Sequence, residues 1–303
     1  MHEVAVIIIN YNSTDYTLEC IESVRNKTSD KLSYQVIVVD NNSEIDEYEK
    51  LKHNFPNQTN ITLHRSDLNT GFGGGNMFGA QFADAQYLLF LNNDALLLND
   101  SLSILKKFME EHPNVGVCTA QNYDQHHKLV PSFDHNKGLR RLVFGRGLLE
   151  KLNPKKYPKR KKEYSHPLQV DWVNGAFLFF RNKAFQKIGG FDTNIFLYFE
   201  EMDLCHRLQK NGYSTMLVPE AKILHYQGVS IGKSRAINME AYLSYLHILK
   251  KNYGWGKYLL IKVYLSLVLL LKPKKWYLLS TVLFGNIRRD SLRQKQLPRI
   301  YED

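Results

Sequence analysis

An apolar run interrupted by three polar residues most constrains what this chain can fold into. The run is Tyr87–Leu98, YLLFLNNDALLL, and the interruption is Asn92-Asn93-Asp94. A short apolar run that ends in a carboxylate is typical of a strand buried on both faces. Open α/β sheets bind ligands at the carboxyl ends of such strands. An acid flanked by two amides there suits a divalent cation shared with a phosphate-bearing ligand, and a polar turn that closes a buried strand is the alternative.

Two further polar strand ends are predicted beside this strand end. Val4–Asn10 and Tyr34–Val39 are apolar runs, and Thr14–Asn26 between them has the apolar spacing of a helix. A strand–helix–strand unit with short links makes a right-handed crossover, which brings both strand ends to one edge of a parallel sheet. We expect a nucleotide at this edge, with Tyr11 stacking on the base and Asp40 accepting a hydrogen bond from base or ribose. Asp40 as the cap of a local turn is the alternative.

A glycine-rich segment follows in the chain. Four of the five residues Gly71–Gly75 are glycine, which lets the backbone approach a ligand closely. The helix predicted after it, Asn76–Ala85, would direct its positive end toward that ligand. The segment is not the dinucleotide-binding fingerprint, because Asn76 stands where the third glycine would be. Its place between two predicted strand ends favours a ligand-binding role.

The segment Gln169–Asp192 predicts two strands and a short helix around Trp172. The small pair Gly175-Ala176 leaves room beside this indole ring. The neighbouring polar residues Asp171 and Asn174 favour a ring that lines a sugar-sized cavity, and burial in the core is the alternative fate of such a tryptophan.

Three acids, Glu200, Glu201 and Asp203, open the next predicted helix. Carboxylates in the first turn of a helix are stabilised by its dipole, and one acid is enough for a cap. The aromatic residues that precede them indicate a partly dry site, which could raise one carboxyl pKa toward that of a general base. His225 follows another predicted strand, where a structural role is its simplest explanation.

Composition bounds the architecture and the partners. A chain of 303 residues with 44% hydrophobic content suits one catalytic domain with an appendage. The three cysteines are too far apart in the sequence for a disulfide framework, and the apolar amino terminus lacks the features of a signal peptide. The net charge of +10 belongs to the tail, because residues 233–303 contain 14 basic and 4 acidic residues. Long apolar runs between these charges favour an anionic membrane surface over nucleic acid.

Together these motifs resemble family 2 glycosyltransferases of the GT-A fold, and most of all their bacterial rhamnosyltransferase-like branch. The resemblance covers residues 3–235, in order and at the family's spacing. Its motifs are IIINYN at 7–12, VVDNNS at 38–43, LNTGFGGGNMFG at 68–79, FLNNDALL at 90–97, WVNGAFLFFR followed by IGGFD, FEEMDLCHRLQKNG at 199–212 and LHYQGVS at 224–230. The fold implied is α/β, with a mostly parallel central sheet flanked by helices.

The resemblance also implies a role for each matching residue. Asp94 would bind Mg²⁺ or Mn²⁺ with His225, and Glu201 would be the catalytic base. Two positions depart from the family pattern, since Asn92 replaces the first acid of D-x-D and Glu201 replaces the usual Asp. The nucleotide-sugar donor would be held by Tyr11, Asn12, Asp40, Asn69, Gly71 and Asn93. The acceptor pocket would be formed by Trp172, Gly175 and Glu200.

The implied reaction is an inverting single displacement with a nucleotide-diphosphate sugar as donor. The branch favours L-rhamnose from dTDP-rhamnose, and galactofuranose or an N-acetylhexosamine are the alternatives. The acceptor would be a saccharide or a polyprenyl-linked saccharide used in cell-surface polysaccharide synthesis. A non-catalytic basic protein that binds nucleic acid or membrane is the alternative from a different class.

The chain is expected to divide into a catalytic domain, residues 1–232, and a helical tail, residues 233–303. The apolar run Tyr258–Leu271 has 14 residues, fewer than the ~20 that a spanning helix needs. We therefore expect helices that lie in the membrane interface, and a protein that is cytoplasmic and peripheral on the inner face of the cell membrane. The alternative is a tail that packs on the catalytic domain or on a second subunit. The basic residues of 155–162 are expected in a solvated loop.

Overall fold

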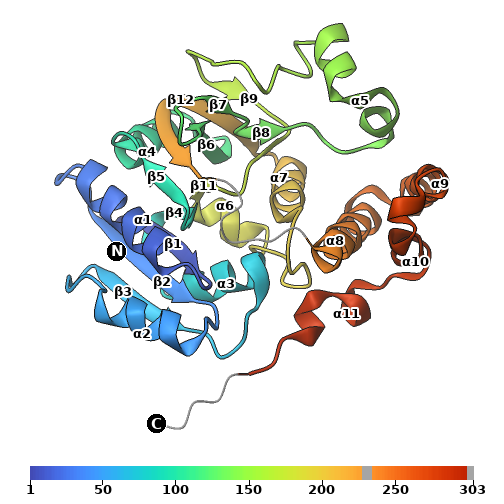
Figure 1. Cartoon of the computed structure of the whole chain (residues 1–303). Helices are drawn as coiled ribbons and strands as arrows, with labels where there is room; N and C mark the ends of the chain where they lie inside the picture. The colour runs from blue at the N-terminus through green and yellow to red at the C-terminus, as the bar shows by residue number, and fades with distance from the viewer. Residues whose placement is uncertain (227–233, 299–303) are drawn as a thin grey trace.

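A computed structural model describes residues 1–226 and 234–298 of the chain (Figure 1). Its core is a sheet in the order β3-β2-β1-β4-β11-β6-β12-β5. The first four strands of that order are mutually parallel, as the predicted crossover requires. They are β1 (His2–Asn10), β2 (Tyr34–Asp40), β3 (Ile61–Arg65) and β4 (Ala85–Asn92).

The second half of the sheet is mixed. Its members are β5 (Ala95–Leu97), β6 (Val115–Tyr123), β11 (Phe177–Arg181) and β12 (Ser214–His225). β11 lies antiparallel between β4 and β6, while β12 is parallel to β6 and antiparallel to β5. Short strands complete the set: β7 (Leu129–Val130), β8 (Phe133–Asp134), β9 (Leu168–Gln169) and β10 (Trp172–Val173). The predicted α/β class with a mostly parallel central sheet is confirmed.

Helices cover both faces of the sheet, and each face has its own apolar core. One face carries α1 (Thr14–Lys27) and α4 (Ser101–Glu111), and α2 (Ile45–His53) packs beside α1. The other face carries α3 (Gly71–Ala80), α6 (Asn182–Lys187) and α7 (Glu200–Lys210). Because both faces are covered, the central strands are apolar throughout rather than alternating, which is the pattern that Tyr87–Leu98 shows.

α3 begins and ends five residues earlier than predicted, since it spans Gly71–Ala80 instead of Asn76–Ala85. The glycines lie within the helix because α3 packs very closely on β1 and β2. A Cβ atom at Gly79 would lie 2.6 Å from Cγ2 of Ile7, and one at Gly75 would lie 3.2 Å from Nδ2 of Asn41. Close approach of helix and sheet therefore outweighs the low helix propensity of glycine here.

The region between β6 and β10 contains a helix that was not predicted. It contains α5 (Leu139–Leu152), which bends at Gly145, where φ is +73°. The basic run 155–162 has no helix or strand, in keeping with the prediction for that part. α5 forms a projection beside the tail helices, drawn in light green in Figure 1.

The tail is helical and packs on the rest of the chain (Figure 1). It consists of α8 (Arg235–Tyr253), α9 (Trp255–Leu270), η1 (Pro273–Lys275), α10 (Tyr277–Phe284), α11 (Ile287–Asp290) and η2 (Leu292–Lys295). A third apolar core joins α8, α9 and α10 to Ile195 and Met202 of the preceding residues. In residues 1–226 and 234–298, no helix is both long enough and apolar enough to cross a membrane.

Candidate active site

Two pockets meet at the carboxyl end of β4. The first, the strand-end pocket, has a volume of about 340 Å³ and follows the ends of β1, β2 and β4. The second, the acid pocket, has a volume of about 540 Å³ and lies at the start of α7. Phe72, Asn92 and Leu197 line both of them. A ligand in one pocket can therefore contact a ligand in the other.

Four of the residues predicted to hold the donor line the strand-end pocket: Tyr11, Asn69, Gly71 and Asn93. Gly71 has φ +75°, and a Cβ atom there would overlap the carbonyl group of Phe196. Its amide donates to Oδ1 of Asn69 at 3.0 Å. Glycine is thus required by both the backbone conformation and the lack of space, which is why it opens the α3 helix.

The other two residues predicted to hold the donor, Asn12 and Asp40, stabilise the loops around this pocket. Asp40 is fully buried, and its Oδ1 accepts from Nδ2 of Asn10 at 2.9 Å while its Oδ2 accepts from the amide of Ser43 at 3.1 Å. Oδ1 of Asn12 accepts from the amide of Glu44 at 2.7 Å, at the start of α2. Neither side chain is part of the pocket lining. Their contact with a nucleotide stays a prediction.

Asn41 lines the strand-end pocket, and sequence reasoning missed it. Its Nδ2 donates to Oδ1 of Asn69 at 3.0 Å and to the carbonyl oxygen of Gly71 at 3.2 Å. Its Oδ1 accepts from the amide of Thr70 at 3.1 Å. Its position directly after β2 was the one sequence signal that could have identified it. Its hydrogen bonds to the glycine-rich segment join residues 28 to 30 positions apart, so they could not be predicted from local sequence.

Asp94 and His225 come together as predicted by the resemblance. Nε2 of His225 lies 3.1 Å from Oδ1 of Asp94, and both side chains are nearly buried. The pairing of β12 with β5 brings them together, because His225 is opposite Ala95 in the sheet. Asn93, which lies between β4 and Asp94, donates to Oγ of Ser13 at 2.7 Å and so links this turn to the start of α1. Residues 227–230 of the last predicted motif lie outside the described residues.

The residues at this position fit a cation that is shared with a ligand. Residues 1–226 and 234–298 contain no cluster of three or more His, Cys, Asp or Glu side chains that could hold a metal ion without further ligands. One carboxylate and one imidazole would leave the other ligand positions to phosphate oxygens and water, as Mg²⁺ and Mn²⁺ at nucleotide sites commonly require. Nδ1 of His225 is buried without a hydrogen-bond partner among the described residues, so the ring is not committed to a second protein contact.

Glu201, the predicted base, lines the acid pocket. Burial raises the pKa of Glu201 to about 7, and amide donors from its own residue and from Gly175 limit that rise. Gly175 also leaves the space that the carboxylate occupies, because a Cβ atom there would overlap Oε1 of Glu201. A carboxyl group that is partly ionised at neutral pH suits a general base.

Glu200 lies beside Glu201 and is 2% exposed. Burial, followed by the charge of Glu201, raises the pKa of Glu200 well above its usual range. Oε1 of Glu200 has no hydrogen-bond partner among the described residues. The two residues before it, Tyr198 and Phe199, have φ of +71° and +70°, a strained conformation that is common at functional sites. The strained backbone, the buried Glu200 and the half-buried Glu201 therefore occur in one short segment.

Trp172 and Gly175, predicted to form the acceptor pocket with Glu200, line the acid pocket. Trp172 is half-buried and packs on two of the apolar cores at once. Its Nε1 has no acceptor among the residues that the structure describes. The ring therefore packs on the core and also lines the acid pocket, while its contact with a sugar stays a prediction.

The tail contributes to both pockets, which no sequence motif indicated. Ile237 of α8 lines the strand-end pocket, and Asn238 and Ala241 line the acid pocket. α8 is held by Lys251, whose Nζ lies 2.8 Å from Oδ2 of Asp192 and 3.0 Å from Oδ1 of Asp203. Asp203, the third acid at the start of α7, thus anchors α8 instead of facing the pocket.

Comparison with known proteins agrees with this geometry. The model of the family described as glycosyl transferase family 2 matches residues 5–189. Rhamnosyltransferase WbbL of Escherichia coli (strain K12) is 28% identical over 236 residues, which cover 74% of this chain and 83% of that protein. The N-acetylglucosaminyl-diphospho-decaprenol L-rhamnosyltransferase of Mycobacterium tuberculosis is 36% identical over 90 residues, 29% of each chain.

Solved structures show the same fold. GalNAc-T7, crystallised with UDP, GalNAc and Mn2+, superposes with a TM-score of 0.58 at 15% identity, over 82% of this chain and 48% of that one. TarS of S. aureus superposes with a TM-score of 0.54 at 15% identity, over 82% of this chain and 66% of that one. Both have the GT-A arrangement, so the predicted GT-A fold is confirmed.

Proposed function

Because this chain belongs to glycosyl transferase family 2, we propose that it transfers a sugar from a nucleotide-diphosphate donor to a hydroxyl group of a saccharide or lipid-linked saccharide. The proposed setting is the synthesis of cell-surface polysaccharide. One observation carries this proposal above the others. The half-buried acid Glu201 lines a pocket that adjoins, at Asn92, the strand-end pocket beside Asp94 and His225.

The proposed donor is dTDP-L-rhamnose. Support comes from the two relatives above, both of which carry the name of a rhamnosyltransferase. The nucleotide would occupy the strand-end pocket, with its base against Tyr11 and Asn41. The diphosphate would extend toward Asp94 and His225, which would hold Mg²⁺ or Mn²⁺. Bound there, the cation would supply positive charge to the departing nucleoside diphosphate.

Glu201 would act as the general base. Its carboxylate would take the proton of the acceptor hydroxyl as the oxygen forms a bond to the anomeric carbon. The bond from that carbon to the diphosphate oxygen breaks on the opposite face, and the electron pair leaves with the nucleoside diphosphate. One displacement inverts the anomeric configuration. Much of the rate enhancement would come from holding both substrates in line. Asn92, which lines both pockets, and Trp172, which lines the acid pocket, would favour this alignment.

The protein is also proposed to work on the inner face of the cell membrane. The outer side of α9 exposes five apolar side chains, each about half exposed: Leu259, Leu260, Val263, Leu267 and Leu270. Lysines surround them in the sequence, at Lys257, Lys262 and Lys272. An apolar helix face bordered by cations suits the interface of an anionic bilayer. Surface binding would bring the acid pocket to a lipid-linked acceptor.

The test of the proposed function is transfer from a donor panel. The full chain would be incubated with Mn²⁺ or Mg²⁺, a lipid-linked saccharide and dTDP-rhamnose, UDP-galactofuranose or UDP-N-acetylglucosamine. We expect turnover with dTDP-rhamnose and, by NMR of the product, inversion at the anomeric carbon. Retention of configuration, or binding of the nucleotides without transfer from any donor, would contradict the proposal.

A further inference from the structure

Three cations lie in the wall of the acid pocket, where the proposed reaction assigns them no role. They are Lys137, which precedes α5, and Arg141 and Arg146 on α5 itself. We call these three residues the cationic cluster. They line the same pocket as Glu201 and Trp172. None of them lines the strand-end pocket.

One carboxylate partly neutralises the cationic cluster. Oδ2 of Asp134 lies 2.7 Å from Nη2 of Arg141 and 3.3 Å from Nη1 of Arg146. The same carboxylate also meets Arg160, whose Nε lies 3.4 Å from Oδ1. Asp134 therefore lies near three guanidinium groups, of which Arg160 also pairs with Oε1 of Glu150 at 3.2 Å. The cluster keeps an excess of positive charge, which a ligand with negative charge can balance.

Lys137 has no carboxylate within 4.0 Å of its Nζ among residues 1–226 and 234–298. Its ammonium group lies instead over two aromatic rings, 4.7 Å from the centroid of Phe199 and 4.5 Å from that of Tyr245. Burial, together with the charges of Arg141 and Arg146, lowers the pKa of Lys137 to about 8. Cation–π contacts offset part of the cost of burying this charge, and an anion at the same position would offset more.

We infer that the cationic cluster binds the diphosphate of a lipid-linked sugar, the hydroxyl-bearing substrate of the proposed transfer. This inference rests on the proposed function. The two phosphates of such a linkage carry two negative charges, which suit a guanidinium fork and an ammonium group in one wall. The sugar beyond the diphosphate would then lie in the acid pocket between Trp172 and Glu201.

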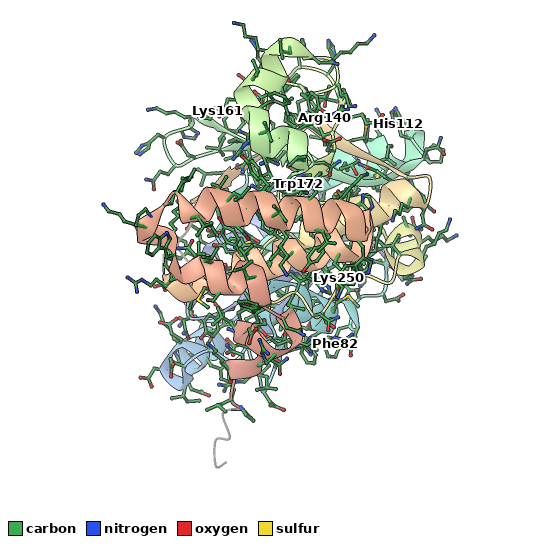
Figure 2. The ribbon with its side chains drawn as sticks, turned by 90° about the vertical axis from the view of Figure 1, so that its right-hand side faces the viewer. Phe82, His112, Arg140, Lys161, Trp172 and Lys250 are labelled. Carbon is green, nitrogen blue, oxygen red and sulfur yellow. The ribbon has the colours of Figure 1, made fainter. Side chains whose placement is uncertain are left out.

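The surface next to the cationic cluster suits the lipid. α5 exposes Val143, Phe144 and Leu148 by 51%, 57% and 42%. α9 lies against α5, where the hydroxyl of Tyr264 donates to the carbonyl oxygen of Leu142 at 2.9 Å. Figure 2, in which the tail helices face the viewer, shows α5 directly above them. A lipid chain attached to a diphosphate at Arg146 would thus meet the apolar faces of both helices.

The donor diphosphate is a less suitable occupant of the cationic cluster. The proposed cation site at Asp94 and His225 lies next to Asn92 and Asn93, which line the strand-end pocket. Neither Asp94 nor His225 lines the acid pocket. If one diphosphate served both places, the donor and lipid ligands would compete. The experiment can therefore separate the two assignments.

The test is calorimetric titration of geranyl diphosphate into the full chain already saturated with Mg²⁺ and dTDP or UDP. Geranyl glucoside serves as the neutral lipid, and inorganic pyrophosphate as the diphosphate without lipid. The variants are Lys137→Met and Arg146→Gln. The matched control is Arg140→Gln, which removes an exposed guanidinium of α5 outside the acid pocket (Figure 2).

We expect geranyl diphosphate to bind with the nucleotide in place, and each variant to weaken that binding at least tenfold while Arg140→Gln leaves it unchanged. Equal binding by wild type and both variants, or loss of binding when the nucleotide is present, would overturn the inference. Pyrophosphate binding as tightly as geranyl diphosphate would overturn its lipid part. Failure of both nucleotides to bind would instead count against the proposed function, and titration of the nucleotide-free protein would still test the cluster.

Discussion

At the residue scale, Glu201 depends on Gly175 for its place in the acid pocket. Gly175 gives both an amide donor and the space in which the Glu201 carboxyl group lies. The sequence placed both residues at the site through the family resemblance, yet it could not show that one depends on the other. They are 26 positions apart and meet only because β10 and α7 pack together.

The ionisation of Glu201 predicts how rate and stability depend on pH. The folded protein holds the proton of Glu201 with a pKa of about 7, against 4.5 in a free side chain. The rate of transfer at low substrate should therefore rise as the pH passes through about 7. The same shift costs stability, by up to about 3 kcal/mol, as the pH rises from 4.5 past 7.

Glu201→Gln should consequently be more stable than wild type at pH 8, and the difference should vanish below pH 5. Urea unfolding at both pH values measures this, with the exposed Glu220→Gln as the control. A variant that is less stable at pH 8 would show that the folded state does not disfavour the ionised carboxylate.

Gly175→Ala should reduce turnover by about tenfold to a hundredfold, because the added methyl group displaces the Glu201 carboxyl group. Nucleotide binding should not change, since Gly175 does not line the strand-end pocket. Steady-state kinetics and nucleotide titration measure the two effects. Gly147→Ala is the control, because a Cβ atom there meets nothing within 4 Å. Equal turnover in both variants would refute the positioning role of Gly175.

At the scale of elements, the strands were the most predictable part of the fold. Their apolar runs are continuous because helices cover both faces of the sheet, and that pattern is strong in one sequence. The start of α3 was predicted too late, since glycine disfavours helix unless a close neighbour requires it. α5 was missed because its basic and glycine residues are typical of a loop, whereas its contact with α9 depends on residues 122 positions away.

α8 is the element whose function was least visible in the sequence. Its side chains complete both pockets, while its own pattern indicates only an apolar helix. The residue that anchors it, Asp203, is fully buried and accepts from Nε of Arg207 at 2.9 Å and from Nδ2 of Asn252 at 2.8 Å. Asp203 also forms an ion pair with Lys251, whose Nζ lies 3.0 Å from Oδ1. Three donors on two helices thus depend on one carboxylate.

Asp203→Ala should destabilise the protein by about 2 to 3 kcal/mol, because it removes the fully buried acceptor shared by Arg207, Lys251 and Asn252. It should also raise the KM for the donor, since α8 carries Ile237 into the strand-end pocket. Denaturant unfolding and donor kinetics under folding conditions measure the two effects, with the exposed Asp30→Ala as the control. Unchanged stability would show that α8 is held without this contact.

At the scale of the whole molecule, the proposed active site lies between two pockets, and the exposed apolar face of α9 is proposed to bind a membrane. Leu267→Glu and Val263→Glu add charge to exposed positions of α9. Each should reduce cosedimentation with vesicles that contain phosphatidylglycerol by about tenfold. Ile45→Glu, on the distant helix α2, is the control. Wild-type binding that is equally strong on neutral phosphatidylcholine vesicles in high salt would contradict the electrostatic part of this proposal.

The arrangement of the whole site could be predicted only in part. Polar strand ends identified Tyr11, Asn93 and Asp94, because parallel strands deliver their ends to one edge. The contacts made by Asp40 inside the protein, the wall formed by α8 and the charge excess at Lys137 arise from packing between distant segments. Such contacts leave no periodic or local signal in a single sequence.

The central claim is that Glu201 deprotonates an acceptor beside a nucleotide held at the strand ends. Its most direct test measures transfer and nucleotide affinity together for wild type and Glu201→Gln. We expect Glu201→Gln to lower turnover by about 10² to 10⁴-fold, with nucleotide Kd within twofold of wild type. Turnover by Glu201→Gln close to that of wild type, with the same nucleotide affinity, would contradict it.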